Sequence, residues 1–166
     1  MKQGYDIVFD RDKLRFNFRI VGICIDRGRV LLQQVKGTDW WFMPGGRCAL
    51  DEPARDCLKR EMKEELDADA EIGRLVWVVE NFFDLNSRSY HELSMFFLVE
   101  FVENTRILGE NEFTVMDDGA AGGLVPVTST WHRLEDLENV PLFPAFLRAG
   151  LQHLPAGTQH IVQRDN

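Results

Sequence analysis

Pro44–Leu66 reads PGGRCALDEPARDCLKREMKEEL and contains the strongest helix signal of the chain, over Asp51–Leu66. An apolar stripe recurs every four residues and falls on one side of that helix: Ala54, Leu58, Met62 and Leu66. The Gly45-Gly46 pair precedes the helix, and glycines let the backbone approach a ligand or another segment closely. The stretch therefore predicts a flexible loop that leads into an amphipathic helix.

Three glutamates of this helix, Glu61, Glu64 and Glu65, follow one another at i, i+3 and i+4. They fall within an arc of about 100° on the helix, and Glu65 projects toward the apolar stripe. Carboxylates this close repel one another, and burying one without a partner is costly. A hard divalent cation relieves both problems, so the pattern indicates an Mg²⁺ or Mn²⁺ site. A solvated acidic helix face is the alternative interpretation.

Two further residues connect the loop to the helix. Glu52 lies six residues after Gly46, and Arg60 lies eight residues after Glu52. An arginine can form a bidentate pair with a carboxylate, for which Glu52 is the candidate, and would then fix the loop against the helix.

At these positions the sequence resembles the Nudix hydrolase family, whose motif is G-x5-E-x7-R-E-U-x-E-E-x-G-U, with U a bulky apolar residue. The matching residues are Gly46, Glu52, Arg60, Glu61, Met62, Glu64 and Glu65. Asp67 and Ala68 depart from it, because the family has glycine and a larger apolar residue there. The lead-in from Trp41 to Gly46 and the ending over 131–147 are also similar to the family, so the resemblance covers most of 16–151.

The resemblance implies an α+β protein, an α/β/α sandwich with a central mixed β-sheet, in one domain over 1–166 with its core at about 16–151. Patterning along the chain agrees with this expectation. Strands are expected at 16–25, 29–35, 71–83, 91–102, 124–131 and 159–163, and helices at 51–66, 134–139 and 145–153. The stretch 103–123 is interpreted as a long loop, because it carries the turn-like groups Asp117-Asp118-Gly119 and Gly122-Gly123.

The resemblance also implies hydrolysis of a phosphoanhydride in a nucleoside diphosphate linked to another group, with Mg²⁺ as cofactor and Mn²⁺ as a substitute. It assigns the metal ligands to Glu61, Glu64 and Glu65, with a backbone carbonyl at Gly45 or Gly46 and Glu52 through water. The catalytic set is Glu64, Arg60 and Glu112; Glu64 or a loop glutamate, Glu110 or Glu112, would activate the attacking water. Candidates for substrate contacts are Arg19, Arg47 and Trp40, each of which could instead be structural.

ADP-ribose or another nucleotide sugar is the favoured substrate, because 81–91 and the strand after it look like the corresponding segment of ADP-ribose pyrophosphatases. An ordinary or oxidised (deoxy)nucleoside triphosphate is the alternative, and a non-catalytic nucleotide-binding domain is a third hypothesis. Isopentenyl-diphosphate isomerase and RNA decapping stay open within the same family.

The composition of the chain limits the classes of binding partner and the compartment that we expect. The net charge of −8 disfavours binding to long nucleic acids but not to a small metal-bound nucleotide. Three cysteines without metal-ligand spacing indicate a reducing cytoplasm, and neither a signal peptide nor a bilayer-spanning segment is expected. A homodimer is a further expectation.

Overall fold

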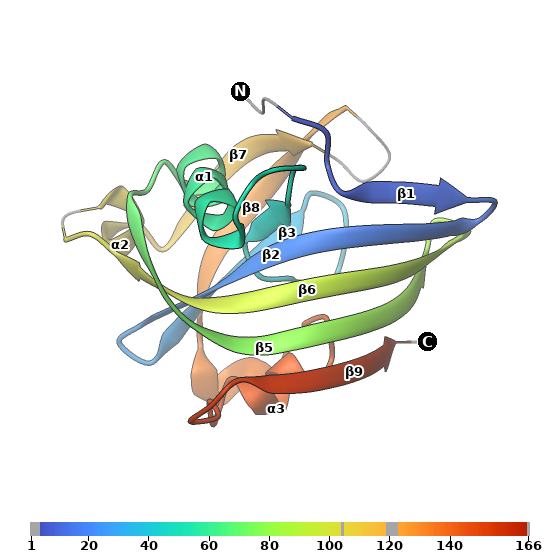
Figure 1. The fold of residues 1–166 in the computed structure, drawn as a ribbon. Helices are drawn as coiled ribbons and strands as arrows, with labels where there is room; N and C mark the ends of the chain where they lie inside the picture. The colour runs from blue at the N-terminus through green and yellow to red at the C-terminus, as the bar shows by residue number, and fades with distance from the viewer. Residues whose placement is uncertain (1–3, 104, 119–122, 166) are drawn as a thin grey trace.

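The structure is a computed structural model that describes residues 4–103, 105–118 and 123–165. Within these ranges one mixed sheet has the order β7-β8-β3-β2-β6-β5-β9, and β1 and β4 pair with β2 beside this path (Figure 1). The strands are β1 (Val8–Arg11), β2 (Leu14–Asp26), β3 (Arg29–Val35), β4 (Gly45–Arg47), β5 (Ala70–Leu85), β6 (Arg88–Phe101), β7 (Glu112–Asp118), β8 (Leu124–Arg133) and β9 (Gln159–Asp165). The helices are α1 (Ala54–Leu66), α2 (Arg106–Gly109), the 3₁₀ helix η1 (Leu134–Asn139) and α3 (Leu147–Gly150).

Parallel and antiparallel pairings alternate in the middle of the sheet. β2 pairs with β6 in parallel and β5 pairs with β9 in parallel, whereas β5 and β6 form a long antiparallel hairpin. The hairpin turn consists of Asn86 and Ser87, both with left-handed φ (51° and 62°), the conformation of a tight two-residue turn. The expected mixed sheet is thereby confirmed.

Successive side chains of β2 point to opposite faces of the sheet, and each face carries an apolar layer. Ile20 and Cys24 face α1, whose buried side chains include Leu58 and Met62. Val21 and Ile23 face the opposite way and pack in the cluster that contains Leu137 of η1 and Leu147 of α3. Helices therefore cover both faces, as the sandwich prediction requires.

Some expectations for individual elements were wrong. The stretch 103–123 is not one loop: α2 and β7 lie within it, although 104 and 119–122 fall outside the described residues. β7 was missed because its strand residues end in Asp-Asp before glycine, a combination typical of turns. Helix α1 begins at Ala54 because Asp51 has a left-handed φ of 62° and Pro53 is extended. The closing helix is short, Leu147–Gly150 instead of 145–153.

Asp67, one of the two departures from the family motif, ends α1 in the left-handed conformation (φ 47°, ψ 36°). Glycine adopts this conformation without steric cost, while aspartate is among the residues that tolerate it best. Its carboxylate lies 3.1 Å from Lys63 Nζ. The departure therefore preserves the helix exit that glycine would provide.

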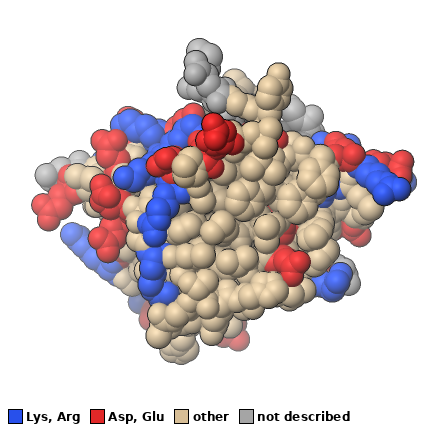
Figure 2. Space-filling view, in the orientation of Figure 1, with Lys and Arg blue, Asp and Glu red and all other residues tan. Residues whose placement is uncertain are grey.

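Charged side chains are unevenly distributed on the surface. Figure 2 shows acidic and basic groups around α1, along the left-hand edge and at the right-hand end, with a broad, largely uncharged area between them over β2, β6 and β5. In the described parts of the chain no helix has the length and apolar character needed to cross a bilayer.

Candidate active site

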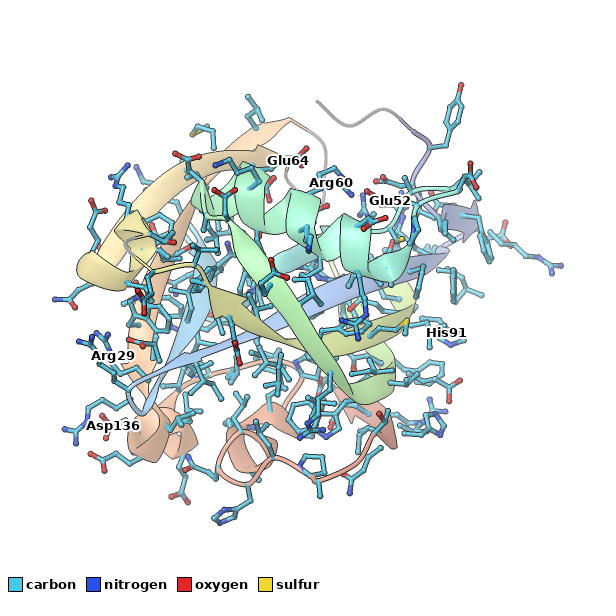
Figure 3. All side chains as sticks on the ribbon, turned by 60° about the vertical axis from the view of Figure 1, so that its left-hand side comes forward. Arg29, Glu52, Arg60, Glu64, His91 and Asp136 are labelled. Atoms are coloured by element: carbon cyan, nitrogen blue, oxygen red, sulfur yellow. The ribbon has the colours of Figure 1, made fainter. Side chains whose placement is uncertain are left out.

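Arg60 of α1 contacts three of the four motif glutamates. Its Nε and Nη2 donate to the two carboxylate oxygens of Glu52 at 2.7 and 3.0 Å, the bidentate pair expected from the sequence. Its Nη1 donates to Glu61 Oε1 at 2.7 Å and to Glu64 Oε2 at 3.1 Å. Figure 3 shows Glu52, Arg60 and Glu64 lying along one side of α1 and the loop before it. One guanidinium thus holds a cluster of carboxylates that would otherwise repel.

Glu65, the fourth glutamate, is held differently. It is only 3% exposed, which confirms that it projects into the buried side of α1. Its Oε2 accepts hydrogen bonds from the Gly45 backbone N–H (3.1 Å) and from Gln33 Nε2 (3.3 Å). Gln33 Nε2 also donates to Ser129 Oγ at 3.3 Å, so β3 and β8 together orient this carboxylate.

The two glycines are required by different contacts. A Cβ on Gly46 would lie 2.2 Å from Glu61 Cδ, so the Glu61 carboxyl group occupies the space of a side chain. A Cβ on Gly45 would lie 2.1 Å from the Ile20 carbonyl oxygen, and the φ of Gly45 is 142°. The Gly45 carbonyl accepts from Arg19 Nη2 at 3.0 Å. The loop can therefore pass between β2 and α1 only without side chains at these positions.

The pKa values of two motif glutamates move in opposite directions. Hydrogen bonding to Arg60 lowers the pKa of Glu52 to about 2. Burial raises the pKa of Glu65 well above its ordinary value, and the nearby charges of Glu61 and Asp117 raise it further, against the opposing effects of Arg19 and the Gly45 N–H. Glu65 is thus a buried carboxylate with like charges beside it, the situation that a divalent cation relieves.

Three residues at this site were missed in the sequence: Gln33, Ser129 and Asp117. Gln33 and Ser129 are fully buried and lie opposite each other in the β3–β8 register. Asp117, in β7, was interpreted as part of a turn, yet its charge acts on Glu65. No local pattern marks these residues, because strand pairing brings them to α1.

The three residues predicted to contact substrate, Arg19, Trp40 and Arg47, differ in their positions relative to the site. Arg19 lies at the site, since it contacts Gly45 and its guanidinium carbon is 5.7 Å from the Phe42 ring centre. Trp40 packs against the same Phe42 ring at 5.6 Å. The side chain of Arg47 is directed to Asp6, 3.9 Å away, while its carbonyl accepts from Arg60.

The two loop glutamates that the sequence suggested as bases lie at the start of β7 or before it. Glu110 pairs with Arg106 at 2.6 Å, and Glu112 accepts from Thr130 Oγ1 at 3.3 Å. Glu112 is five residues from Asp117 along β7, which corresponds to about 16 Å at the usual rise per residue of a β-strand. Asp117, and neither of these glutamates, is among the largest influences on the pKa of Glu65.

Cys48, Glu52 and Cys57 bring three potential ligand atoms within 4.8 Å of one another. Burial strongly raises the pKa of the Cys57 thiol, which disfavours the thiolate that a soft metal requires. Glu52 is already paired with Arg60. This cluster therefore serves as packing beneath the loop.

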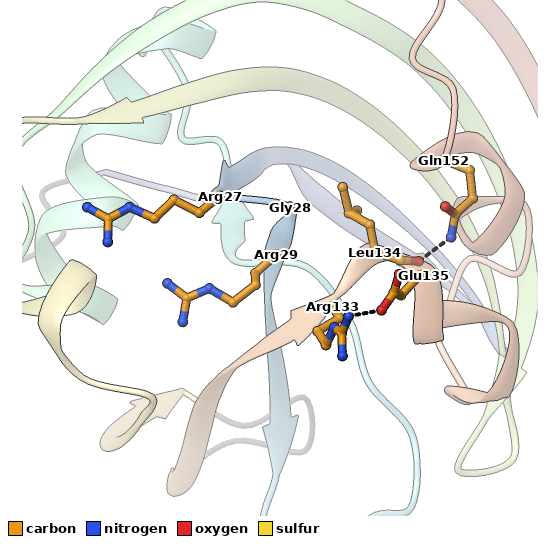
Figure 4. A pocket seen from close by; sticks show the side chains of 7 residues that line it. All are labelled: Arg27, Gly28, Arg29, Arg133, Leu134, Glu135 and Gln152. Carbon is orange, nitrogen blue, oxygen red and sulfur yellow. Dashed lines mark hydrogen bonds and ion pairs between the residues drawn. The ribbon is translucent and has the colours of Figure 1, made fainter.

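A separate cavity of about 490 Å³ lies between the β2–β3 turn and η1, lined by Arg27, Gly28, Arg29, Arg133, Leu134, Glu135 and Gln152 (Figure 4). It contains none of the predicted site residues. Arg29 pairs with Asp26, and Arg133 pairs with Glu135. Most of its positive charge is thus already compensated.

Comparison with known proteins agrees with this geometry. The family model of the NUDIX domain matches residues 13–153. A MutT NUDIX hydrolase from Burkholderia pseudomallei is similar in fold (TM-score 0.59, 23% identity, 84% of this chain and 98% of that chain). So is an ADP-ribose pyrophosphatase from Streptococcus suis (TM-score 0.58, 19% identity, 89% and 98%). Comparison with curated proteins gives no significant match.

Proposed function

The chain belongs to the Nudix hydrolase family, and we propose that it is a pyrophosphohydrolase that cleaves a nucleoside diphosphate linked to another group, with ADP-ribose or another nucleotide sugar as substrate. The observation that carries this proposal is the set of four carboxylates on α1 and the loop before it, of which Glu61 lies against Gly46 and Glu65 is buried among like charges. The choice of substrate rests on the resemblance of 81–91 to ADP-ribose pyrophosphatases, since proteins of both the ADP-ribose pyrophosphatase and the MutT type share this fold.

The residues present fit a divalent cation. The atoms that they offer to a metal are carboxylate oxygens, the ligands that Mg²⁺ and Mn²⁺ prefer. Glu61, Glu64 and Glu65 would hold the ion with the Gly46 carbonyl, and Glu52 would join through water. When bound, the ion neutralises negative charge on the phosphoryl oxygens during hydrolysis.

The protein side chains perform the remaining tasks. Arg60 fixes the carboxylates of Glu52, Glu61 and Glu64, and Gln33 with the Gly45 N–H fixes Glu65. A water oxygen forms a bond to one phosphorus, the bridging P–O bond breaks, and a carboxylate oxygen accepts the proton of the water. Asp117 is a candidate for this proton acceptor beside Glu64 and Glu112, because its charge acts on Glu65. Arg19 and Trp40, near Gly45 and Phe42, would contact the substrate, as would Arg47.

A substrate panel tests the proposal. ADP-ribose, other nucleotide sugars and ordinary and oxidised nucleoside triphosphates are incubated with Mg²⁺ or Mn²⁺, and phosphate release is read with and without added phosphatase. We expect hydrolysis of ADP-ribose, abolished by EDTA and restored by Mg²⁺. Preference for triphosphates would support the alternative of a MutT-type pyrophosphatase, and binding without turnover would support a non-catalytic domain.

A variant connects the activity to this site. Glu64→Gln should lower kcat several hundredfold with the fold intact, since a metal ligand contributes several kcal/mol to transition-state stabilisation. Glu138→Gln, on η1, makes the same charge change away from the site and should leave kcat unchanged. Loss of less than fivefold in Glu64→Gln at saturating Mg²⁺ would remove Glu64 from the metal site. A cytoplasmic location and a homodimer also stay proposals, to be tested by fractionation and light scattering.

A further inference from the structure

A row of polar side chains crosses three neighbouring strands on the face opposite α1. Asn17 of β2 pairs in register with Glu92 of β6, which pairs in register with Asn81 of β5. Residues further inward on the same face, such as Val21 and Val79, belong to the apolar cluster with η1 and α3. Asn17 and Asn81 are only 5% and 4% exposed, so the row is almost entirely enclosed, and Glu92 is its half-buried member.

The hydrogen bonds of this row are incomplete in one specific way. Glu92 accepts from Ser94 Oγ at 3.1 Å and from Asn17 Nδ2 at 3.5 Å. Because the N–H of Asn17 points to the carboxylate, its Oδ1 must point elsewhere. Asn17 Oδ1 and Asn81 Oδ1 are buried and have no hydrogen-bond partner among the described residues. Buried polar atoms are nearly always satisfied, and these two oxygens belong to residues that both pair in register with one carboxylate, so the row is a candidate for contact with a ligand.

The chemistry of that ligand follows from the atoms left over. Two carboxamide oxygens and the remaining lone pairs of a carboxylate are all acceptors, so the ligand must supply hydrogen-bond donors. A carbonyl oxygen placed beside Glu92 would face a carboxylate, which can only accept. The row therefore discriminates between a donor group and an acceptor group of the same size.

The place of the row identifies which part of a nucleotide reaches it. Gly45, beside the Glu65 carboxylate, lies opposite Val21 on β2, and the row lies at Asn17, four residues further along. Four residues of strand span about 13 Å. Arg19 lies between them on the same face and contacts the Gly45 carbonyl. A nucleotide whose phosphates lie at the glycine loop would extend the edge of its base over this distance, whereas its ribose hydroxyls would reach only about half as far.

We propose that Asn17, Asn81 and Glu92 recognise the base of the substrate and select one that carries an exocyclic amino group, adenine foremost, over the corresponding oxo base. This inference rests on the proposed hydrolysis of a nucleoside diphosphate derivative and adds the choice of base. Glu92 accepts one N–H of the amino group, and the carboxamide oxygens of Asn17 and Asn81 are the acceptors left for the other.

The first test needs no variant. AMP and IMP differ in having an amino group or an oxo group at the same position of the ring. Their affinities for the full chain are measured by calorimetry in EDTA, where no turnover is needed. We expect AMP to bind about tenfold to a hundredfold more tightly, the discrimination typical of such donor–acceptor contacts. Affinities within twofold of each other would overturn the proposal. A lower affinity for 2′- or 3′-deoxy-AMP would in that case assign the row to the ribose, and the proposal would still be overturned.

A pair of variants assigns the selectivity to the row. Glu92→Gln replaces one acceptor with an amide that can donate to an oxo group, so the ratio of the two affinities should fall to about one. Glu80→Gln makes the same charge change at the neighbour of Asn81 on the other face of β5, where Glu80 pairs with His160, and should keep the wild-type ratio. A preserved ratio in Glu92→Gln, with unchanged circular dichroism, would overturn the proposal.

Failure of this inference and failure of the proposed function give different results. ADP-ribose hydrolysis with equal affinity for AMP and IMP would refute only the role of the row. Tight, selective AMP binding without hydrolysis of any panel substrate would refute only the catalytic proposal.

Discussion

Gly46→Ala moves a single carboxylate of the candidate active site, that of Glu61, by an amount that the structure defines. The added Cβ would lie 2.2 to 2.4 Å from three atoms of the Glu61 carboxyl group. Carbon atoms in contact need about 3.5 Å, so the carboxyl group must move by about 1.3 Å. Misplacement of about 1 Å at a reacting centre can cost about a hundredfold in rate. We therefore expect kcat for ADP-ribose to fall at least a hundredfold at saturating Mg²⁺.

Stability should change little in the same variant. Gly46 has no left-handed φ that would disfavour alanine. The Glu61 carboxyl group is the end of a flexible side chain, and losing its 2.7 Å contact with Arg60 would cost about 1 kcal/mol. Lower unfolded-state entropy offsets part of that cost. The melting temperature should stay within about 4 °C of wild type.

Gly45→Ala provides the contrast. Its Cβ would collide with the Ile20 carbonyl of β2, which cannot rotate away, at a φ of 142°. We expect a loss of about 3 kcal/mol and a melting temperature lower by about 6–12 °C. Differential scanning fluorimetry and phosphate release measure the two effects. Gly46→Ala with more than a fifth of wild-type kcat, or with the larger thermal loss, would refute the argument that Glu61 replaces a side chain at Gly46.

Four further expectations follow from the same site. In EDTA at pH 7, Glu65→Gln should raise the melting temperature, because a carboxyl whose pKa is raised in the folded state disfavours folding at every pH above its ordinary pKa; an unchanged or lower value would contradict its burial among like charges. Glu52→Gln should lower the melting temperature at pH 7. The contribution of Glu52, whose pKa is lowered, is present above its ordinary pKa of 4.5 and lost as the pH falls toward about 2, so the deficit should disappear in acid melts. Asp117→Asn should lower kcat about tenfold to a hundredfold while Glu112→Gln stays within twofold; kinetics with the reverse order would return the proton acceptor to Glu112. Asp67→Gly should raise the melting temperature by about 2–4 °C, since a left-handed residue other than glycine costs about 1 kcal/mol, and thermal melts without a gain would show that the Lys63 contact compensates.

The sequence predicts the parts of this protein that repeat along the chain. The four-residue period of α1 and the β-rich runs of β2, β3, β5 and β6 were found within a few residues of their bounds. The burial of Glu65 was also predictable, because helix geometry fixes it, and the Arg60–Glu52 pair was predictable from the bidentate match between a guanidinium and a carboxylate. Local periodicity is sufficient for such features.

Contacts between distant strands are not predictable in this way. Gln33 and Ser129 meet through the β3–β8 register, although 96 residues separate them. The row of Asn17, Glu92 and Asn81 likewise depends on the pairing of three strands. Each of these residues, taken alone, is an unremarkable polar residue in a strand. β7 was missed for a related reason, because its pairing with β8 overrides the turn propensity of Asp117-Asp118.

The parallel pairing of β2 with β6 also determines the order in which the chain can fold. The β5–β6 hairpin needs only the two-residue turn Asn86-Ser87, whereas Leu14 must find Ser89 across 75 residues of chain. Closing so long a loop costs entropy before any contact stabilises it. We expect the hairpin to form first and to act as the template on which β2 docks. Refolding kinetics should therefore be slowed by disrupting the Asn86-Ser87 turn, while truncations in β2 should mainly accelerate unfolding.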